Sequence, residues 1–372
     1  MLHNLMDYIC SYDNLYQAFR SAESCKRYRG EVLTFKQNLE QNLFSIQKDM
    51  MDGTYKTGPY REFYIRYPKP RLVMALGFRD RVVQWAIYRQ IFPYLEKRFI
   101  EDSFACRKGK GAMAAVERVL YWERQIIRKP DGKKWYCLKI DIAKYFYRVD
   151  HAIALDMLRE ITDDERFIHL MDSIINNTDV PFGLPVGVSA DDCPPDQRLY
   201  NVGMPIGNLS SQMIANLYLN KLDQFCKHVL HIKYYARYMD DIVIFDNSLN
   251  RLHYIKDQIA EYIQDKLALQ LNKKTSIRRM TAGVEFVGRV ITPAGVRLRK
   301  SSKQRIKRVF KREARLYAAG VTSIFHVKQL IASYYGQLLH ADTYNLRNWI
   351  YENIVFVRGQ PLLEVPANGM MR

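Results

Sequence analysis

The feature that most constrains this chain is a pair of adjacent aspartates, Asp240 and Asp241, set between two apolar runs. The run 233–237 precedes the pair, with Tyr238 and Met239 between them, and the run 242–245 follows it. Both runs have the aromatic and β-branched composition of buried strands, which predicts a tight hairpin with the acids at its turn. An isolated Asp-Asp is usually a solvated turn. Carboxylates held on a rigid sheet instead suit Mg²⁺, which prefers oxygen ligands.

A third acid stands in matching context upstream and favours the metal site over the solvated turn. The strand-like run 134–140 ends at Asp141, and a helix that Asp150 is expected to cap follows. Phe146 lies five residues after Asp141, an arrangement typical of nucleotide sites. Asp141 and Asp240 could then share two metal ions about 3.5–4 Å apart, the spacing used for in-line phosphoryl displacement.

Three features, which follow one another along the chain in the order typical of the family, resemble a reverse transcriptase over about residues 55–350. Asp141 resembles the first metal ligand of that family, and the stretch 238–241 resembles its catalytic hairpin. Between them, the stretch 203–212 resembles the motif that lies under the template and the incoming nucleotide. Each match is weak alone, but the order and the local structure together make a strong signal. The resemblance implies an RNA-directed DNA polymerase.

The resemblance implies an α+β right-hand fold with fingers, a palm built on an antiparallel sheet, and a helical thumb. The expected parts are an N-terminal helical extension at 1–54, fingers at 55–133, palm at 134–293 with an insertion at about 160–203, thumb at 294–355, and a loose tail at 356–372. Helical spacing is expected at 4–52, 80–98, 112–128, 151–177, 210–230 and 250–267. Pro130-Asp131-Gly132 is expected to be a hairpin turn, and 284–298 a second hairpin with Gly295 in its turn. Asp191-Asp192 is expected to be a solvated turn.

The implied reaction is attack by a primer 3′-hydroxyl on the α-phosphorus of a deoxynucleotide, with two Mg²⁺ ions, or Mn²⁺ as a substitute. Asp141, the backbone of Ile142, and Asp240 would hold the ions, and Asp241 would act less directly. Lys274 matches a lysine proposed in the family to protonate pyrophosphate. An exposed lysine after a strand is otherwise simply solvated.

Five positions match the family's nucleotide site. Lys69 and Arg71 match finger residues that grip the triphosphate, the alternative being a solvated basic strand. Phe146 matches a steric gate against the ribose 2′-hydroxyl, or is a core residue. Gly207, beside Ile206, would let the backbone approach the nascent base pair.

Other positions suggest contacts with the primer and template. Residues 300–315 carry many Lys and Arg, which form either a solvated face or a track for phosphates. The basic loop 107–111 is a second candidate track, and Phe286 and Gly288 resemble a primer grip, with palm–thumb packing as the alternative. The residues expected to contact primer or template are Arg107, Lys108, Lys110, Gln212, Tyr238, Met239, Phe286, Gly288, Lys303, Lys307 and Lys311.

The narrower resemblance is to the reverse transcriptases of diversity-generating retroelements. Ile206 stands where retroviral and group II intron enzymes usually have Gln, and Gln212 stands where they have Pro. The stretches 60–63 and 107–111 are also similar to this group, which implies low-fidelity copying of a template RNA for mutagenic retrohoming, with a small, basic, helical accessory protein. A defence-associated or retron-like enzyme is the alternative, although Gln212 speaks against a retron. Phe146 argues against an RNA-copying RNA polymerase, and the three intact aspartates argue against an idle RNA-binding scaffold.

The composition agrees with a nucleic-acid partner. Lys and Arg number 57 against 39 Asp and Glu, giving a formal charge of +18, which favours a polyanion. The six cysteines form no C-x-x-C pair, and neither a signal peptide nor a membrane span is evident, so a cytoplasmic protein without a membrane partner is expected. The tail after residue 355 is too short for a ribonuclease H domain, so RNA removal is expected to come from elsewhere.

Overall fold

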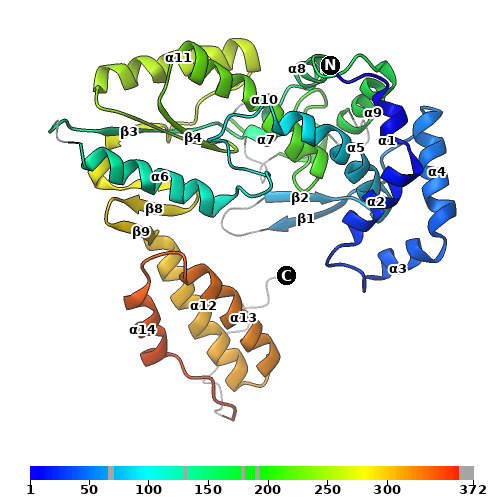
Figure 1. The fold of residues 1–372 in the computed structure, drawn as a ribbon. Coiled ribbons are helices and arrows are strands. Elements are labelled where there is room, and N and C mark those ends of the chain that lie inside the picture. The colour runs from blue at the N-terminus through cyan, green and yellow to red at the C-terminus, as the bar shows by residue number, and fades with distance from the viewer. Residues whose placement is uncertain (66–70, 130–131, 177–180, 186, 189–192, 360–372) are drawn as a thin grey trace.

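The computed structural model describes residues 1–65, 71–129, 132–176, 181–185, 187–188 and 193–359 (Figure 1). Of four N-terminal helices, α1 (Leu5–Ile9), α2 (Tyr12–Glu23) and α3 (Gly30–Gln37) pack against the long helix α5 (Phe78–Glu96), and α4 (Leu39–Met51) packs on α2 and α3. Ser11 caps α2 by accepting a hydrogen bond from the Asn14 N–H at 3.3 Å. The helical expectation for 4–52 is confirmed, with α4 ending at Met51, followed by Asp52 and a left-handed Gly53.

A four-stranded antiparallel sheet lies at the centre of the molecule. Its strands are β3 (Tyr136–Asp141), β4 (Tyr234–Tyr238), β5 (Asp241–Asp246) and β6 (Ser276–Arg279), in the order β4-β5-β3-β6. The hairpin expected around the paired acids is confirmed as β4–β5, closed by the pair Tyr238↔Asp241. The register also sets Asp141 directly opposite Asp241. Two strands distant in sequence therefore place their acids side by side.

The period-2 alternation of side chains divides the sheet between two apolar cores. Leu138, Ile140 and Ile244 face the larger core with helices α10 (Leu209–Gln224) and α11 (Leu249–Leu267). Cys137 and Val243 face the second core, with α6 (Ala112–Ile127). Figure 1 shows α11 above the sheet and α6 below it. Helices therefore cover both faces of the sheet. The end of the sheet that carries the three aspartates is left at the edge of these layers.

Between β3 and α10 lie α7 (Tyr145–Arg148), α8 (His151–Arg159) and α9 (Glu165–Ile175). Asp150 caps α8 as expected, because its carboxylate accepts the Ile153 N–H at 3.0 Å. The helix expected at 210–230 instead changes form, since α10 is followed by a π-helical turn, η3 (Phe225–Val229). Asp191 and Asp192, expected in a solvated turn, lie outside the described residues.

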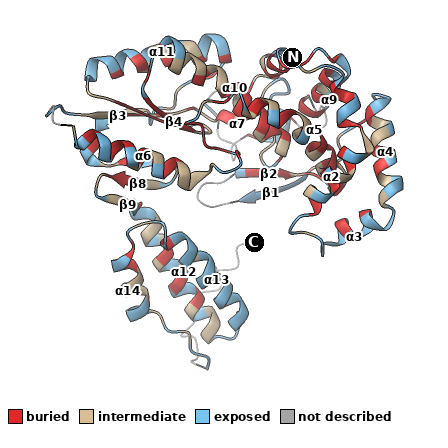
Figure 2. Ribbon diagram, viewed as in Figure 1, coloured by how far each residue is buried: buried red, intermediate tan, exposed pale blue. Residues whose placement is uncertain are grey.

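Two strands precede α5 and form a separate ribbon. They are β1 (Arg61–Ile65) and β2 (Arg71–Ala75), paired antiparallel. Figure 2 shows β1 exposed along its length, whereas β2 buries alternate residues. The ribbon joins the centre of the molecule through the Met74 N–H, which donates to the Ile206 carbonyl at 3.0 Å.

The single hairpin expected at 284–298 is wrong. The segment forms three antiparallel strands, β7 (Val284–Phe286), β8 (Arg289–Thr292) and β9 (Gly295–Leu298), because Val287-Gly288 makes an additional turn with φ of 47° and 75°. Gly295 is the first residue of β9 and pairs with Thr292. Pro130 and Asp131 of the other expected hairpin turn lie outside the described residues, and the described elements on its two sides are helix α6 and strand β3.

The C-terminal helices form a small bundle of their own. α12 (Lys300–Ala318), α13 (Ile324–Leu338) and α14 (Tyr344–Asn353) pack around Ile306, Phe310, Leu338 and Leu346. The bundle lies beyond β9, away from the central sheet (Figure 1). Among the described residues, no helix has the length and apolar character needed to cross a membrane.

Candidate active site

The three aspartates come together at the end of the central sheet. Asp141 ends β3, Asp241 begins β5 opposite it, and Asp240 occupies the hairpin turn. Asp240 is half-buried, and burial raises the pKa of its carboxyl, with the negative charge of Asp141 raising it further. Two carboxylates that repel each other in a partly buried site favour the binding of a cation, because its positive charge offsets theirs.

The structure separates the roles of these acids. Within the described residues, neither the Asp141 nor the Asp240 carboxylate forms an ion pair with a basic side chain, whereas Asp241 pairs with Lys139 and accepts the Val287 N–H at 3.1 Å. Among the residues that the structure describes, no three His, Cys, Asp or Glu side chains form a metal site by themselves. Asp141 and Asp240 therefore fit a divalent cation whose shell is completed by other oxygens, such as substrate phosphates.

Lys139 is a site residue that the sequence reading missed. Burial lowers the pKa of its amino group to about 8, against the opposing effects of neighbouring groups that include Asp141 and Asp240. Its amino group also lies over the Phe286 ring, 5.4 Å from the centroid. The signal was present, because Lys139 precedes Asp141 by two residues on one strand and must share its face of the sheet.

The residues expected to bind the nucleotide lie on β2, on α7 and in the segment just before α10. Arg71 begins β2, and its positive charge lowers the pKa of Asp240, although burial has the larger, opposite effect. Phe146, on α7, is half-buried with its ring 5.6 Å from that of Tyr145, and its carbonyl accepts the Met204 N–H at 2.7 Å. This hydrogen bond ties α7 to the 203–212 segment. Lys69 lies outside the described residues.

Ile206 and Gly207 pack against the β-ribbon. Ile206 lies against a small apolar cluster that includes Met74 and Phe182. Gly207 has a φ of 117°, and a Cβ added to it would stand 3.1 Å from Val73 Cγ1. The position needs glycine for its backbone conformation and for its close approach to β2.

The loop that carries Lys274 is attached to the strand of Asp141. The Asn272 N–H donates to the Asp141 carbonyl at 2.7 Å, and Asn272 Oδ1 accepts the Lys274 N–H at 3.1 Å. Lys274 itself is exposed. Lys274 therefore lies on a short turn that is tied to the strand of Asp141, and its role as a proton donor stays a prediction.

Arg107 does not fit the expected contact with nucleic acid. Its side chain is 4% exposed and pairs with both carboxylate oxygens of Glu96, while Nη1 donates to the carbonyls of Ile100 and Ser103 at 2.7 Å. This guanidinium fastens the 100–111 segment to α5, so Arg107 is a structural residue. Lys110 pairs with Glu101. Lys108 is exposed and remains available to a phosphate.

Phe286 also differs from its expected role. Its side chain is fully buried in the second core, which the central sheet shares with α6, so the ring itself has no exposed surface for a primer. Gly288 lies in the adjacent turn with open space around it. Tyr238 and Met239 are half-buried in the catalytic hairpin, and Gln212 on α10 accepts a weak hydrogen bond from Cys106 Sγ at 3.4 Å.

The lysines of α12 lie on the C-terminal bundle. The Lys307 amino group stands 4.0 Å from the centroid of the Trp349 ring, and that of Lys311 stands 5.4 Å from it. Lys303 and Lys307 line one hollow with Thr343. Their stems are thus supported by α14 while their charges remain at the surface.

We expect the neighbours Arg107 and Lys108 to respond oppositely to substitution. Arg107→Ala should lower the free energy of unfolding by about 2 kcal/mol, because it leaves Glu96 and two carbonyls without their partner. Lys108→Ala should leave the melting temperature unchanged and weaken RNA binding at low salt. Thermal melts and RNA titrations at two salt concentrations measure both effects. Equal melting temperatures for the two variants would contradict the structural role of Arg107.

An acid at the end of one strand, opposed by a two-acid hairpin on the next strand, defines a palm-type nucleic-acid polymerase. Residues 63–291 match the model of the family described as reverse transcriptase (RNA-dependent DNA polymerase). The match covers more than half of the 372 residues, and the chain belongs to that family. It is an RNA-directed DNA polymerase with the right-hand fold that the sequence predicted.

Several known proteins are similar to this chain. Protein YkfC of Escherichia coli (strain K12) is 24% identical over 323 residues, which cover 75% of this chain and 78% of YkfC. The group II intron-encoded protein LtrA of Lactococcus lactis subsp. cremoris is 25% identical over 197 residues, or 52% of this chain and 29% of LtrA. The apo telomerase structure from Candida tropicalis, truncated from its C-terminal domain, aligns with a TM-score of 0.46 and 12% identity over 65% of this chain and 55% of that one. This chain therefore spans less than a third of LtrA.

Proposed function

We propose that this chain copies a template RNA into cDNA with two Mg²⁺ ions, in a low-fidelity reaction of the diversity-generating type. The observation that carries the polymerase chemistry is the register that sets Asp141 opposite Asp241, with Asp240 in the turn between the strands. Asp141 and Asp240 would hold the ions. Bound there, the ions would activate the primer 3′-hydroxyl and stabilise the leaving pyrophosphate.

The chain's own residues would supply position and charge. Arg71 would grip the triphosphate, since its charge already acts on Asp240. Lys139 and the Val287 N–H hold Asp241 and leave Asp141 and Asp240 to the ions. The lysines of α12 and exposed Lys108 would contact backbone phosphates of template and primer, which gives affinity without sequence preference.

Low fidelity is supported by the surroundings of Ile206. This side chain packs with apolar neighbours and carries no group that could hydrogen-bond to a base or a sugar. Discrimination that rests on apolar contact is limited to about 1–3 kcal/mol, or roughly 10–200-fold. The resemblance implies that errors concentrate opposite template adenines, and that a small basic accessory protein takes part. A defence-associated or retron-like role is the alternative.

We expect Ile206→Gln to reduce misincorporation opposite adenine more than it reduces correct extension, because an amide can hydrogen-bond where an alkyl group cannot. Sequencing of cDNA made by both proteins on one adenine-rich template measures this. Ile206→Leu, which keeps the apolar character, serves as the control. Equal adenine error rates for wild type and Ile206→Gln would contradict the mechanism.

A second experiment tests the biological role. cDNA made in cells is sequenced beside its genomic template, in the presence and absence of neighbouring genes. Adenine-specific changes that reach a second genomic copy would support retrohoming. Faithful cDNA that never enters the genome would favour the defence or retron-like alternative.

A further inference from the structure

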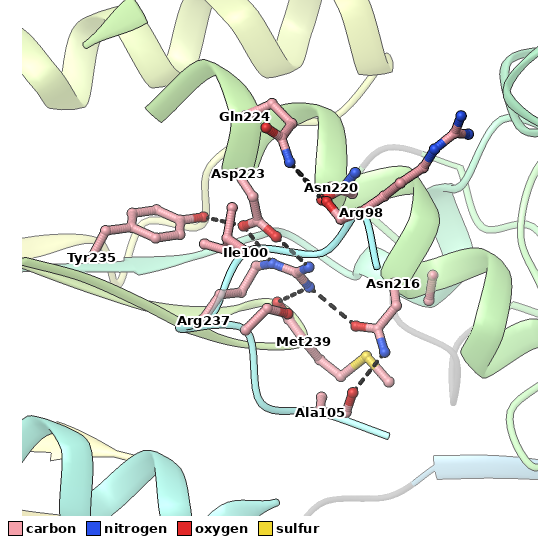
Figure 3. A network of polar contacts seen from close by, with 12 residues as sticks. Arg98, Ile100, Ala105, Asn216, Asn220, Asp223, Gln224, Tyr235, Arg237 and Met239 are labelled. Carbon is pink, nitrogen blue, oxygen red and sulfur yellow. Dashed lines mark hydrogen bonds and ion pairs between the residues drawn. The ribbon is translucent and has the colours of Figure 1, made fainter. Parts of the chain in front are cut away.

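A buried ion pair lies directly beneath the catalytic hairpin. Arg237, the residue before Tyr238, and Asp223 of α10 both have fully buried side chains. The guanidinium donates from Nε and Nη2 to the two carboxylate oxygens, at 2.7 and 2.6 Å (Figure 3). Well-packed apolar side chains are often as stable as such a pair, because desolvation of the charges offsets their attraction. Stability alone therefore gives a weak reason for its presence.

The remaining donors and acceptors of the pair extend to other elements. Arg237 Nη1 donates to Asn216 Oδ1 at 3.3 Å and to the Met239 carbonyl at 3.4 Å, as Figure 3 shows. Asn216 in turn donates to the Ala105 carbonyl at 2.7 Å. The Tyr235 hydroxyl donates to Asp223 Oδ1 at 2.6 Å. One guanidinium thus connects α10 and the hairpin turn, and Asn216 links it to the segment after α5.

The contact with Met239 falls on the most strained residue of the hairpin. Met239 has a φ of 52°, in the left-handed region that side chains with a Cβ rarely adopt. Such a conformation persists only where the surroundings impose it. Arg237 is itself fixed on both sides of its backbone, because its N–H donates to the Asp102 carbonyl and its carbonyl accepts the Phe104 N–H, each at 2.9 Å.

We propose that Arg237 is a positioning residue whose guanidinium, clamped by Asp223, holds the Met239 peptide so that the next side chain, Asp240, is aimed at Asp141. The fork of the guanidinium is essential, since it must bind two carboxylate oxygens and a carbonyl at once. An ammonium group on a flexible stem has no such fixed geometry.

The first test removes both charges together. Arg237→Met alone would leave the Asp223 carboxylate buried without a partner and should lower the melting temperature strongly. Arg237→Met combined with Asp223→Asn leaves no orphan charge and keeps an oxygen to accept the Tyr235 hydroxyl. We expect this double variant to recover most of the melting temperature, yet to extend a primer about 10²-fold more slowly, the cost of a misplaced reacting group. The MgCl₂ concentration for half-maximal rate should rise, with RNA affinity unchanged.

Tyr235→Phe is the matched control, because it removes a hydrogen bond to Asp223 without touching Met239. It should keep the wild-type rate and MgCl₂ dependence. If the double variant does not fold, the Arg237→Lys protein is tested in its place. We expect it to show the same slower primer extension and the same raised MgCl₂ requirement. A folded double variant, or a folded Arg237→Lys protein, with a wild-type rate would overturn the proposal. A slower rate with unchanged MgCl₂ dependence would overturn it as well, since the defect would then lie away from Asp240.

Discussion

Asp240→Asn is expected to slow primer extension by about 10³-fold or more, while RNA binding remains. The amide keeps the size of the side chain and removes the anionic ligand that a divalent ion needs at this position. The melting temperature should rise, because burial and the charge of Asp141 raise the pKa of Asp240 and so make its ionised form unfavourable in the folded protein at neutral pH. Single-turnover extension and thermal melts measure the two effects.

Asp241→Asn is the matched comparison on the neighbouring residue. Its carboxylate is held by Lys139 and the Val287 N–H, so substitution should leave a buried ammonium group without its partner and lower the melting temperature. Its effect on extension should be smaller than that of Asp240→Asn. Near wild-type extension by the Asp240→Asn protein would show that the metal ligands lie elsewhere.

Phe146→Ala is expected to increase the use of ribonucleotides relative to deoxynucleotides by about 10–200-fold, the range that one apolar contact can discriminate. The ring stands on α7, five residues after Asp141, and the Met204 N–H fixes the backbone beneath it. Loss of the ring would open space beside C2′ of the incoming sugar. Single-nucleotide extension with each type of triphosphate measures the ratio.

Tyr145→Phe provides the control for this second prediction. Tyr145 is buried beside Phe146 and donates its hydroxyl to the Ala215 carbonyl at 2.6 Å, so the variant should lose stability and keep the wild-type sugar preference. An unchanged ratio in a folded and active Phe146→Ala protein would assign Phe146 to the core alone.

The catalytic hairpin followed from local sequence because its determinants lie within a dozen residues. The apolar runs on both sides of Asp240 and Asp241 bury their side chains as a pair of strands. A two-residue turn must then join these strands. The cap at Asp150 is equally local, since its carboxylate accepts a hydrogen bond from the N–H of Ile153, three residues ahead. Such features are set by neighbours along the chain, and they were predicted correctly.

The partners of buried groups come from distant segments, and only the tertiary structure decided them. Nothing near Arg107 in sequence shows that α5 would bury it against Glu96, and nothing near Phe286 shows that Lys139 would cover its ring. The joining of Asp223 to Arg237 depends on α10 packing against the face of the sheet that α11 also covers. The sequence alone determined where the three acids stand and which runs form the strands beside them, because acids and strand-forming runs are visible in the chain itself. Tertiary packing determined which charges are held in buried ion pairs, because burial reverses the favourable state of a charge unless a partner meets it.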